Sequence, residues 1–321
     1  MNGVAATELR QSPPGVPSAD ESAASPVCAA AADFWLDLLF RVAGRAPAVT
    51  RVTRPLFVRC AYRFSRAIRL ATTANARRIL GPDVARKRIE VFGRRVVENF
   101  YDFVCDVGQS LHLTREQLLA RIDSVEGHDH YEAARALKKG AIIATAHMGS
   151  FEAGAAAIVD REHAAHVVFK RDETRFEQVR TSLRAKLGVS EAPVDEGWPL
   201  WLRLREALLR DEVVMVQADR VMPGQKGARV PFLHGHLLLP TGPIKLAIAS
   251  GAPIIPVFAV RTPEHKIRIH VEPAIIVSDD PAASLLELSR VLEKFVRAYP
   301  EQWLLFHRAF CEDQDGTTNH V

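Results

Sequence analysis

Short apolar runs alternate with segments whose apolar residues recur every three or four positions in the larger, C-terminal part of the chain. The short runs predict strands, several of them buried on both faces, over residues 141–146, 166–169, 213–217, 254–260 and 267–271. The segments with helical spacing predict helices over residues 151–160, 175–187, 201–209, 241–250 and 284–298. This alternation favours an α/β fold in which a central, mostly parallel sheet is flanked by helices.

The N-terminal part of the chain has a different pattern. Residues 1–30 are rich in Ala, Ser, Pro and Gly without periodicity, which predicts a disordered tail. The first apolar stretch, Phe34 to Ala43, is interrupted by charges and is shorter than the roughly 20 residues that a membrane-spanning helix needs. Helical spacing resumes near residue 81. We therefore expect basic amphipathic helices over residues 31–80 and one large domain over 81–321.

Charge is distributed unevenly along the chain. Residues 41–97 contain fourteen Arg and one Lys but only Asp83 and Glu90, a net charge of +13, so the remainder carries −9. Such a segment favours an anionic partner, either a phospholipid surface or a nucleic acid. Bulky apolar residues such as Phe57, Tyr62 and Phe64 lie among the arginines, which favours anionic membrane lipid and no nucleic acid. The alternative is an Arg-rich helix that packs on the domain and is otherwise solvated.

The four cysteines are scattered without a Cys-x-x-Cys pair, which indicates neither a zinc site nor a disulfide framework. This cysteine usage is typical of a reducing, cytosolic compartment.

The segment AIIATAHMGSFE, residues 141–152, contains the candidate chemistry. A predicted buried strand ends just before His147, and ligands bind outside the carboxyl ends of strands in open α/β sheets. Glu152 lies five positions on, too far around a helix to share a face with His147. The two can meet if His147 lies in the turn before the helix and Glu152 reaches back to its ring. Gly149 would permit that turn and let a substrate approach the backbone.

A His followed five residues later by an acid carries little information alone. Two such pairs occur in this chain, the second being His307 with Glu312, and about that many are expected by chance from its composition. The strand end, the glycine and the flanking sequence must therefore distinguish a catalytic pair from a chance one.

These residues and several later segments resemble the late acyltransferases of lipid A biosynthesis, the lauroyl/myristoyl family, and related glycolipid acyltransferases. The resemblance covers roughly residues 85–310 and includes the family's His-x4-acid (HX4E) motif at His147 and Glu152. Further matching segments, in chain order, are Lys170 and Arg171, RAKLG (184–188), QAD ending at Asp219, VPFLHGHLLLPTGPIKLA from Val230, SGAPIIPVFAVR (250–261) and PEQWLLFHRAF from Pro300. Ser150 and Phe151 stand where the family often has Asn and Trp, and Arg220 follows Asp219 where many members have Gln.

The resemblance implies a glycerolipid acyltransferase-like fold and transfer of an acyl chain from acyl carrier protein (acyl-ACP) or coenzyme A (acyl-CoA) to a lipid or glycolipid hydroxyl. His147 would be the general base with Glu152 behind it, and no cofactor or metal is implied. Arg184, and next Arg171, are candidates for oxyanion or phosphate contact. Asp219 and Arg220 would line the pocket or pair with each other. The implied location is the cytoplasmic face of the inner membrane, peripheral or interfacial.

Two alternatives remain open. A catalytically silent lipid-binding protein could have the same fold. A metallohydrolase could use His147, Asp219, His234 and His236 as ligands, because His234 and His236 have the spacing of some metal-binding pairs.

Overall fold

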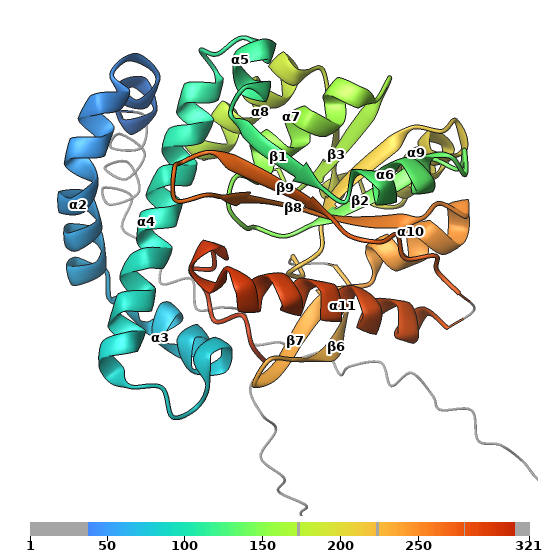
Figure 1. The fold of residues 1–321 in the computed structure, drawn as a ribbon. Helices are drawn as coiled ribbons and strands as arrows, with labels where there is room; N and C mark the ends of the chain where they lie inside the picture. The colour runs from blue at the N-terminus through green and yellow to red at the C-terminus, as the bar shows by residue number, and fades with distance from the viewer. Residues whose placement is uncertain (1–37, 172–173, 223–224, 279, 312–321) are drawn as a thin grey trace, which may run out of the picture.

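A seven-stranded sheet forms the centre of the computed structural model (Figure 1). The strand order is β1-β9-β8-β2-β5-β3-β4, and the five strands from β8 to β4 are parallel. β9 is antiparallel to β8, and β1 is parallel to β9, so one edge of the sheet runs the other way. The strands are β1 (Ile122–Glu126), β2 (Ala141–Thr145), β3 (Ala165–Phe169), β4 (Ser190–Pro193), β5 (Val213–Gln217), β8 (Ile254–Arg261) and β9 (Ile267–Val271).

The structure describes residues 38–171, 174–222, 225–278 and 280–311. The predicted tail over residues 1–30 lies outside this part, as do residues 31–37 of the predicted basic region. Among the described residues, no helix combines the length and the apolar character needed to cross a bilayer.

Both faces of the sheet are buried beneath helices. Alternate β2 residues join different cores: Ile142 packs with the helices of one face and Ile143 with those of the other. The first face is covered by α9 (Trp198–Leu209), α10 (Gly242–Ser250) and α11 (Pro281–Ala298), and the second by α6 (His128–Arg135) and α7 (Phe151–Arg161). This two-sided burial explains why the strands appear in the sequence as continuous apolar runs.

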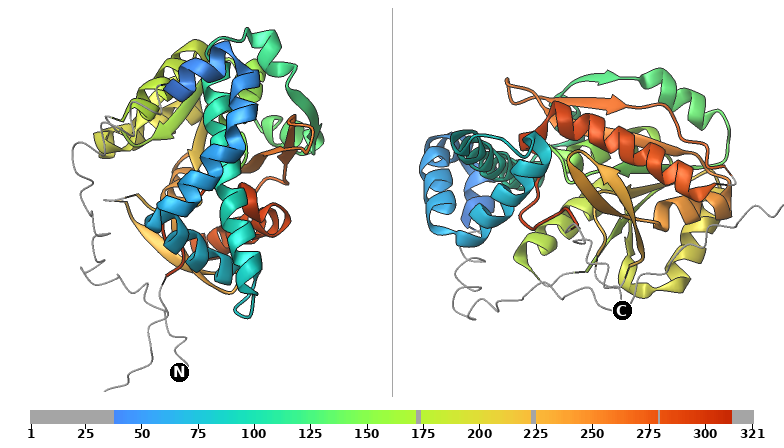
Figure 2. Two further views of the ribbon diagram at one scale, coloured as in Figure 1. Left: turned by 90° about the vertical axis from the view of Figure 1, so that its left-hand side faces the viewer. Right: turned by 90° about the horizontal axis from the view of Figure 1, so that it is seen from below.

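Helices from the N-terminal part and the middle of the chain surround the carboxyl ends of the parallel strands. α4 (Arg86–Ser110) packs on α8 (Arg175–Leu187), and α2 (Pro47–Phe64) and α3 (Arg66–Leu80) pack on the outside of α4. Figure 2 shows α2 and α4 side by side at this end of the molecule. Residues 38–45 are also helical. The described residues further contain the short helix α5 (Arg115–Leu119) and two 3-10 turns, η1 (Val194–Glu196) and η2 (Pro300–Gln302).

The sheet and helices predicted from the pattern are confirmed, and the mostly parallel sheet flanked by helices is the predicted fold class. Four strands were not predicted. β1 and β4 lie at the sheet edges, where a polar sequence such as that of β1 suffices, and β6 (Gly227–Phe232) and β7 (Gly235–Pro240) form a separate antiparallel hairpin. The sequence of β1 is mostly polar, and the buried residues of β6 alternate with exposed ones, so neither has a continuous apolar run. β7 does contain an apolar run, Leu237 to Leu239, which the pattern analysis did not assign to a strand.

Candidate functional site

His147 lies directly beyond the end of β2, opposite Asp219 beyond the end of β5. The two strands are parallel neighbours in which Thr145 pairs with Gln217, so the residues two positions further on face each other. Nδ1 of His147 is 2.8 Å from Oδ1 of Asp219, and the backbone N–H of His147 donates to Oδ2 at 3.1 Å. The register of two adjacent strands therefore brings together residues that are far apart in the sequence.

Asp219 is enclosed and fully bonded. Its side chain is 1% exposed, and the indole N–H of Trp303 donates to Oδ2 at 2.9 Å. Burial by itself raises the pKa of a carboxyl group, but His147, Arg220 and the Trp303 bond together lower the pKa of Asp219 below its ordinary value. Asp219 is thus an ionised acceptor at neutral pH. Trp303 packs the C-terminal segment on the sheet and also fixes this carboxylate.

The His147 ring is held in one tautomer. A carboxylate can only accept, so Nδ1 carries the proton that bonds to Asp219 and the lone pair is on Nε2. Burial lowers the pKa of His147, Arg220 and Arg180 lower it further, and Asp219 opposes them; the net direction is downward. His147 is therefore neutral near pH 7. Among the described residues, none bonds to Nε2, which leaves that atom available as a base.

A large pocket of about 750 Å³ opens beside this ring. Its wall combines His147 and Phe151 with aromatic side chains of α4 and of the C-terminal segment, and with cationic groups. The lining includes Phe100, Phe103, Phe306, His307, Arg171, Arg180 and Arg220. An imidazole base thus faces a cavity that is both apolar and cationic.

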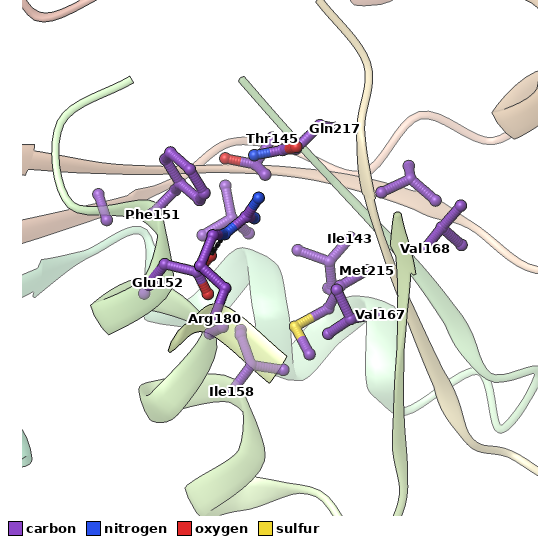
Figure 3. A pocket seen from close by; sticks show the side chains of 15 residues that line it. Ile143, Thr145, Phe151, Glu152, Ile158, Val167, Val168, Arg180, Met215 and Gln217 are labelled. Atoms are coloured by element: carbon purple, nitrogen blue, oxygen red, sulfur yellow. Dashed lines mark hydrogen bonds and ion pairs between the residues drawn. The ribbon is translucent and has the colours of Figure 1, made fainter. Parts of the chain in front are cut away.

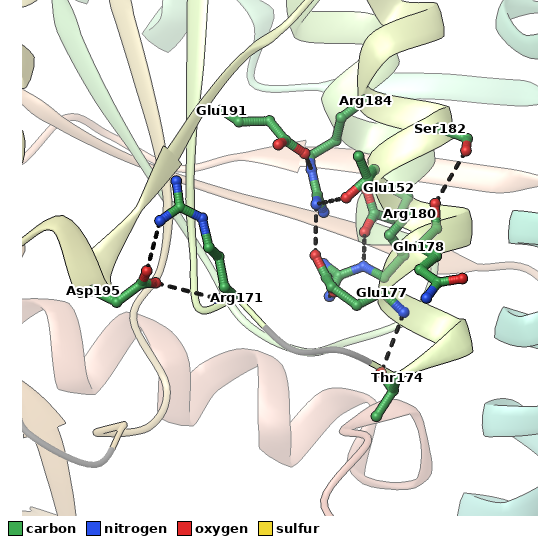
Figure 4. Close-up of polar contacts among 11 residues, drawn as sticks. Glu152, Arg171, Thr174, Glu177, Gln178, Arg180, Ser182, Arg184, Glu191 and Asp195 are labelled. Atoms are coloured by element: carbon green, nitrogen blue, oxygen red, sulfur yellow. Dashed lines mark hydrogen bonds and ion pairs between the residues drawn. The ribbon is translucent and has the colours of Figure 1, made fainter. Parts of the chain in front are cut away.

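Glu152 does not contact His147, which corrects the expected His–Glu pair. The turn at Gly149 has a positive φ of 57°, and α7 begins at Phe151, whose ring lies against the His147 ring at 5.7 Å between centroids. Glu152 follows on another side of the helix and points to α8, where it accepts from Nε of Arg180 (Figure 4). The carboxylate behind His147 is Asp219 instead.

Gly149 is needed for the turn but does not contact the pocket. A Cβ at this position would lie 2.2 Å from the carbonyl oxygen of Ala259 on β8, and the positive φ disfavours other residues. We expected a substrate to approach the Gly149 backbone closely, but the neighbouring strand β8 occupies that space.

A buried polar cluster anchors the residue after Gly149. The Ser150 hydroxyl donates to Asp106 of α4 at 2.8 Å and accepts from Arg261 of β8 at 2.8 Å. Charge attraction from Arg261 and Arg121 lowers the pKa of Asp106, although burial opposes this. The cluster ties α4 and β8 to the start of α7, and so fixes the backbone next to His147.

Arg184 cannot contact a substrate, which corrects its predicted role. Its side chain is 1% exposed, donates to Glu191 at 2.7 Å and to Thr181 at 2.9 Å, and pairs with buried Glu177. Its guanidinium also lies over the Phe169 ring, 4.2 Å from the ring centroid. These contacts join α8 to β3 and β4, so its role is structural.

The pocket cation from α8 is Arg180, one helical turn before Arg184. Arg180 pairs with Glu152 and Glu177, and its guanidinium lies over the rings of Phe151 and Phe176. The sequence pattern did not reveal it, because helical spacing alone does not say which of two arginines on one helix faces the cavity.

Arg220 and Arg171 both line the pocket, but in different settings. Arg220 has a buried Nε without a hydrogen-bond partner among the described residues, and no ion pair joins it to Asp219. Arg171 is 60% exposed and pairs with Asp195 at 2.9 Å and Glu196 at 3.1 Å. Arg220 is therefore the cation with unused hydrogen-bonding capacity beside the base.

A second, narrower cavity of about 50 Å³ adjoins this pocket beneath α7 (Figure 3). It shares Phe151, Val168, Arg180 and Gln217 with the larger pocket. Its deeper wall is apolar and includes Ile143, Ile158, Val167 and Met215. Glu152 and Arg180 lie at one side of it.

The ligand set of a metallohydrolase is not assembled. His234 and His236 belong to the β6–β7 hairpin, where the His234 carbonyl accepts from Arg78 and His236 lies 3.1 Å from Arg229. Across the described ranges, no group of three His, Cys, Asp or Glu side chains is placed to hold a metal ion.

Comparison with known proteins identifies the family. A family described as bacterial lipid A biosynthesis acyltransferase matches residues 43–312. The chain belongs to this family. It is 28% identical over 209 residues to a phosphatidylinositol mannoside acyltransferase of Mycobacterium tuberculosis, covering 63% of this chain and 64% of the relative. It is 25% identical over 210 residues to the lipid A biosynthesis lauroyltransferase of Escherichia coli, covering 63% of this chain and 66% of that protein. The match thus spans a little under two thirds of these relatives, and it confirms the resemblance found in the sequence.

Proposed function

We propose that this protein transfers a fatty acyl chain from an acyl-ACP or acyl-CoA thioester to a hydroxyl group of a lipid or glycolipid. The single observation that carries the proposal is the His147–Asp219 pair, which presents a neutral imidazole with an unbonded Nε2 to a large pocket. Membership of the acyltransferase family supports it. The names of the two relatives support a glycolipid acceptor.

The proposed reaction balances without a further reactant. Nε2 of His147 takes the hydroxyl proton as the acceptor oxygen attacks the thioester carbonyl, and Asp219 stabilises the resulting imidazolium. The tetrahedral oxyanion then collapses, the C–S bond breaks, and the thiolate leaves with the proton from His147. The products are an ester and a free thiol.

Arg220 is our candidate for stabilising the oxyanion. It lines the pocket and has unused donor capacity, whereas Arg184 is buried and Arg171 is paired with two carboxylates. Preorganised donors aimed at the developing negative charge commonly supply a large share of catalysis.

Glu152 is a positioning residue in this proposal. Its carboxylate holds Arg180, which lies between Phe151 and Phe176 on the pocket wall. Loss of Glu152 would leave Arg180 with Glu177 as its remaining carboxylate partner, so this part of the pocket wall would be held less firmly. The acid of the HX4E motif then acts through α8 rather than on the imidazole.

The narrow cavity beneath α7 is our candidate site for the end of the acyl chain, since about 50 Å³ can hold only a few methylene groups. Its wall is mainly apolar, and it continues from the pocket that contains the base. Burial of methylene groups stabilises binding by about 0.8 kcal/mol each, so cavity depth can select chain length.

We propose that the protein lies at the cytoplasmic face of the inner membrane, in a peripheral or interfacial position. The basic N-terminal helices with their exposed apolar side chains support attachment to the surface of anionic lipid.

Replacement of His147 by Ala tests the proposed function. With an acyl-CoA or acyl-ACP donor and total lipid extract as acceptor, thiol release and ester formation should fall by several orders of magnitude while vesicle binding is unchanged. Equal turnover in both proteins, or none in the wild type, would support the silent lipid-binding alternative. Stoichiometric zinc or manganese in the purified protein, with inhibition by chelators, would support the metallohydrolase. Lipid analysis of a deletion strain would identify acceptor and acyl group together.

A further inference from the structure

A second large hollow, of about 990 Å³, lies outside the catalytic pocket between α2, α3 and the first half of α4. Its wall contains six arginines, Arg59, Arg63, Arg69, Arg77, Arg86 and Arg94, and a single acidic residue, Glu90. The two cavities have no lining residue in common. We call this feature the arginine hollow.

The positive charge of the arginine hollow is largely uncompensated. Glu90 pairs with Arg86 at 3.2 Å. Among the described residues, no carboxylate lies within ion-pair distance of the other five arginines. A surface that gathers so many guanidinium groups on one concavity attracts anions, and the planar fork of Arg suits phosphate.

Two of these arginines are held in place by other parts of the protein. The Arg69 guanidinium donates to the backbone carbonyls of Tyr62, at 2.9 Å, and of Arg63, and so closes the end of α2. Arg94 lies over the Tyr62 ring at 5.8 Å. The corner between α2 and α3 is thus built around fixed cations, while Arg59, Arg63 and Arg77 are exposed and available.

Large apolar side chains project from the same helices into solvent. Phe64 and Leu70 line the arginine hollow and are 77% and 48% exposed. On α2, Val52 and Leu56 are 80% and 67% exposed, one turn apart. Exposed apolar groups beside cations suit the boundary between phospholipid headgroups and acyl chains. A nucleic acid or an acidic protein would match the charge but not this apolar rim.

We propose that the arginine hollow binds the phosphate headgroups of anionic phospholipid in a bilayer, with Phe64, Leu70 and the exposed residues of α2 inserted between the lipids. The proposal gives the protein a lipid-binding surface separate from its substrate pocket. It rests on the membrane attachment proposed above and not on the acyl-transfer chemistry, so the site and the chemistry can fail separately.

The test compares two triple variants with the same charge change. Arg59→Gln/Arg63→Gln/Arg77→Gln removes three exposed arginines of the hollow. Arg51→Gln/Arg88→Gln/Arg95→Gln removes three exposed arginines of α2 and α4 that do not line it. Binding is measured by co-sedimentation with phosphatidylglycerol/phosphatidylcholine vesicles and with pure phosphatidylcholine vesicles at several salt concentrations. Circular dichroism and thermal melting establish that both variants fold.

Wild-type protein should bind the anionic vesicles with an affinity that falls as the salt concentration rises. It should bind pure phosphatidylcholine vesicles much less tightly. The hollow variant should lose about 100-fold in affinity, because each arginine near an anionic surface contributes roughly 1 kcal/mol. The control variant should lose less than about tenfold. The hollow variant with Lys in place of Gln should regain only part of its affinity, because Lys restores the charge but not the planar fork of Arg. Thioester turnover with detergent-dispersed acceptor should be unchanged in both.

Equal losses in the two triple variants would show diffuse attraction and overturn the arginine hollow as a site. The proposal would also be overturned if the hollow variant bound vesicles as tightly as wild type. The same holds if the hollow variant lost affinity only for acyl carrier protein or for duplex DNA. Vesicle binding by the His147→Ala variant equal to wild type supports the proposal even if turnover is never detected.

Discussion

His147 and Asp219 are 72 positions apart in the sequence, yet Nδ1 of one lies 2.8 Å from Oδ1 of the other. Their contact follows from the parallel pairing of β2 with β5, in which Thr145 is opposite Gln217. Because the carboxylate accepts from Nδ1, the basic lone pair is left on Nε2 beside the pocket. Residues that hold this arrangement should affect catalysis, and those elsewhere in the charged network should affect folding.

Asp219→Asn should reduce kcat of acyl transfer by about 10³-fold or more, as loss of the orienting carboxylate does in Ser-His-Asp enzymes. The amide can donate to Nδ1, which permits the wrong tautomer. The double variant with His147→Ala should be no slower than His147→Ala alone, because the two residues act as a unit. Thiol release from an acyl-CoA donor measures both. If the double variant lost activity by the product of the two single losses, the two residues would act independently, which would contradict the pairing.

The two candidate carboxylates can be separated by pH profile. For the wild type, kcat/KM should fall as pH drops through the pKa of His147, which burial lowers below the ordinary imidazole value. Asp219 raises the pKa of His147, so Asp219→Asn should move this acid limb to lower pH. Glu152→Gln should leave the limb in place and reduce kcat modestly, by about tenfold, through Arg180. If the acid limb moved in Glu152→Gln and not in Asp219→Asn, Glu152 and not Asp219 would be the carboxylate that acts on His147.

Arg220→Gln should have two effects that a structural residue would not combine. The loss of a positive charge that lowers the pKa of His147 should move the acid limb to higher pH. The loss of an oxyanion donor should reduce kcat by about 10²-fold with little change in KM. Arg171→Gln serves as the matched control, because Arg171 lines the same pocket but is exposed and paired. Equal effects of the two substitutions would argue against a special role for Arg220.

Arg184→Met should reduce stability rather than catalysis. The substitution leaves Glu177 buried with Arg180 as its remaining ion-pair partner, and breaking a buried pair costs about 3 kcal/mol. Urea unfolding measures the loss, and kcat per folded molecule should stay within a few-fold of wild type. A large fall in kcat with an unchanged free energy of unfolding would show that Arg184 acts on the substrate and not on stability.

Ile158→Phe should shift donor preference to shorter acyl chains. Ile158 is 6% exposed and lines the narrow cavity, so a larger side chain would fill its deeper part. The ratio of kcat/KM for long-chain over medium-chain acyl-CoA should fall by about tenfold or more, whereas Ile158→Leu, of similar volume, should leave it nearly unchanged. If Phe slows all donors equally, the acyl chain binds elsewhere.

The sequence by itself determined the parallel sheet, the position of His147 at a strand end and the concentration of positive charge near the N-terminus. Each of these follows from a local pattern: burial on both faces of β2 gives a continuous apolar run, and the arginines can be counted directly. The family was also visible, because several ordered motifs occur along one chain.

Only the tertiary structure decided which carboxylate meets His147, and which arginine of α8 faces the pocket. Glu152 is near His147 in sequence, but helix geometry turns it to Arg180, whereas strand pairing brings Asp219 to the ring. Helical spacing placed Arg180 and Arg184 on the same helix but could not show that one lines a cavity and the other is buried between Glu177 and Glu191. Such contacts depend on strand order and register, which non-local packing sets and short-range patterns do not encode.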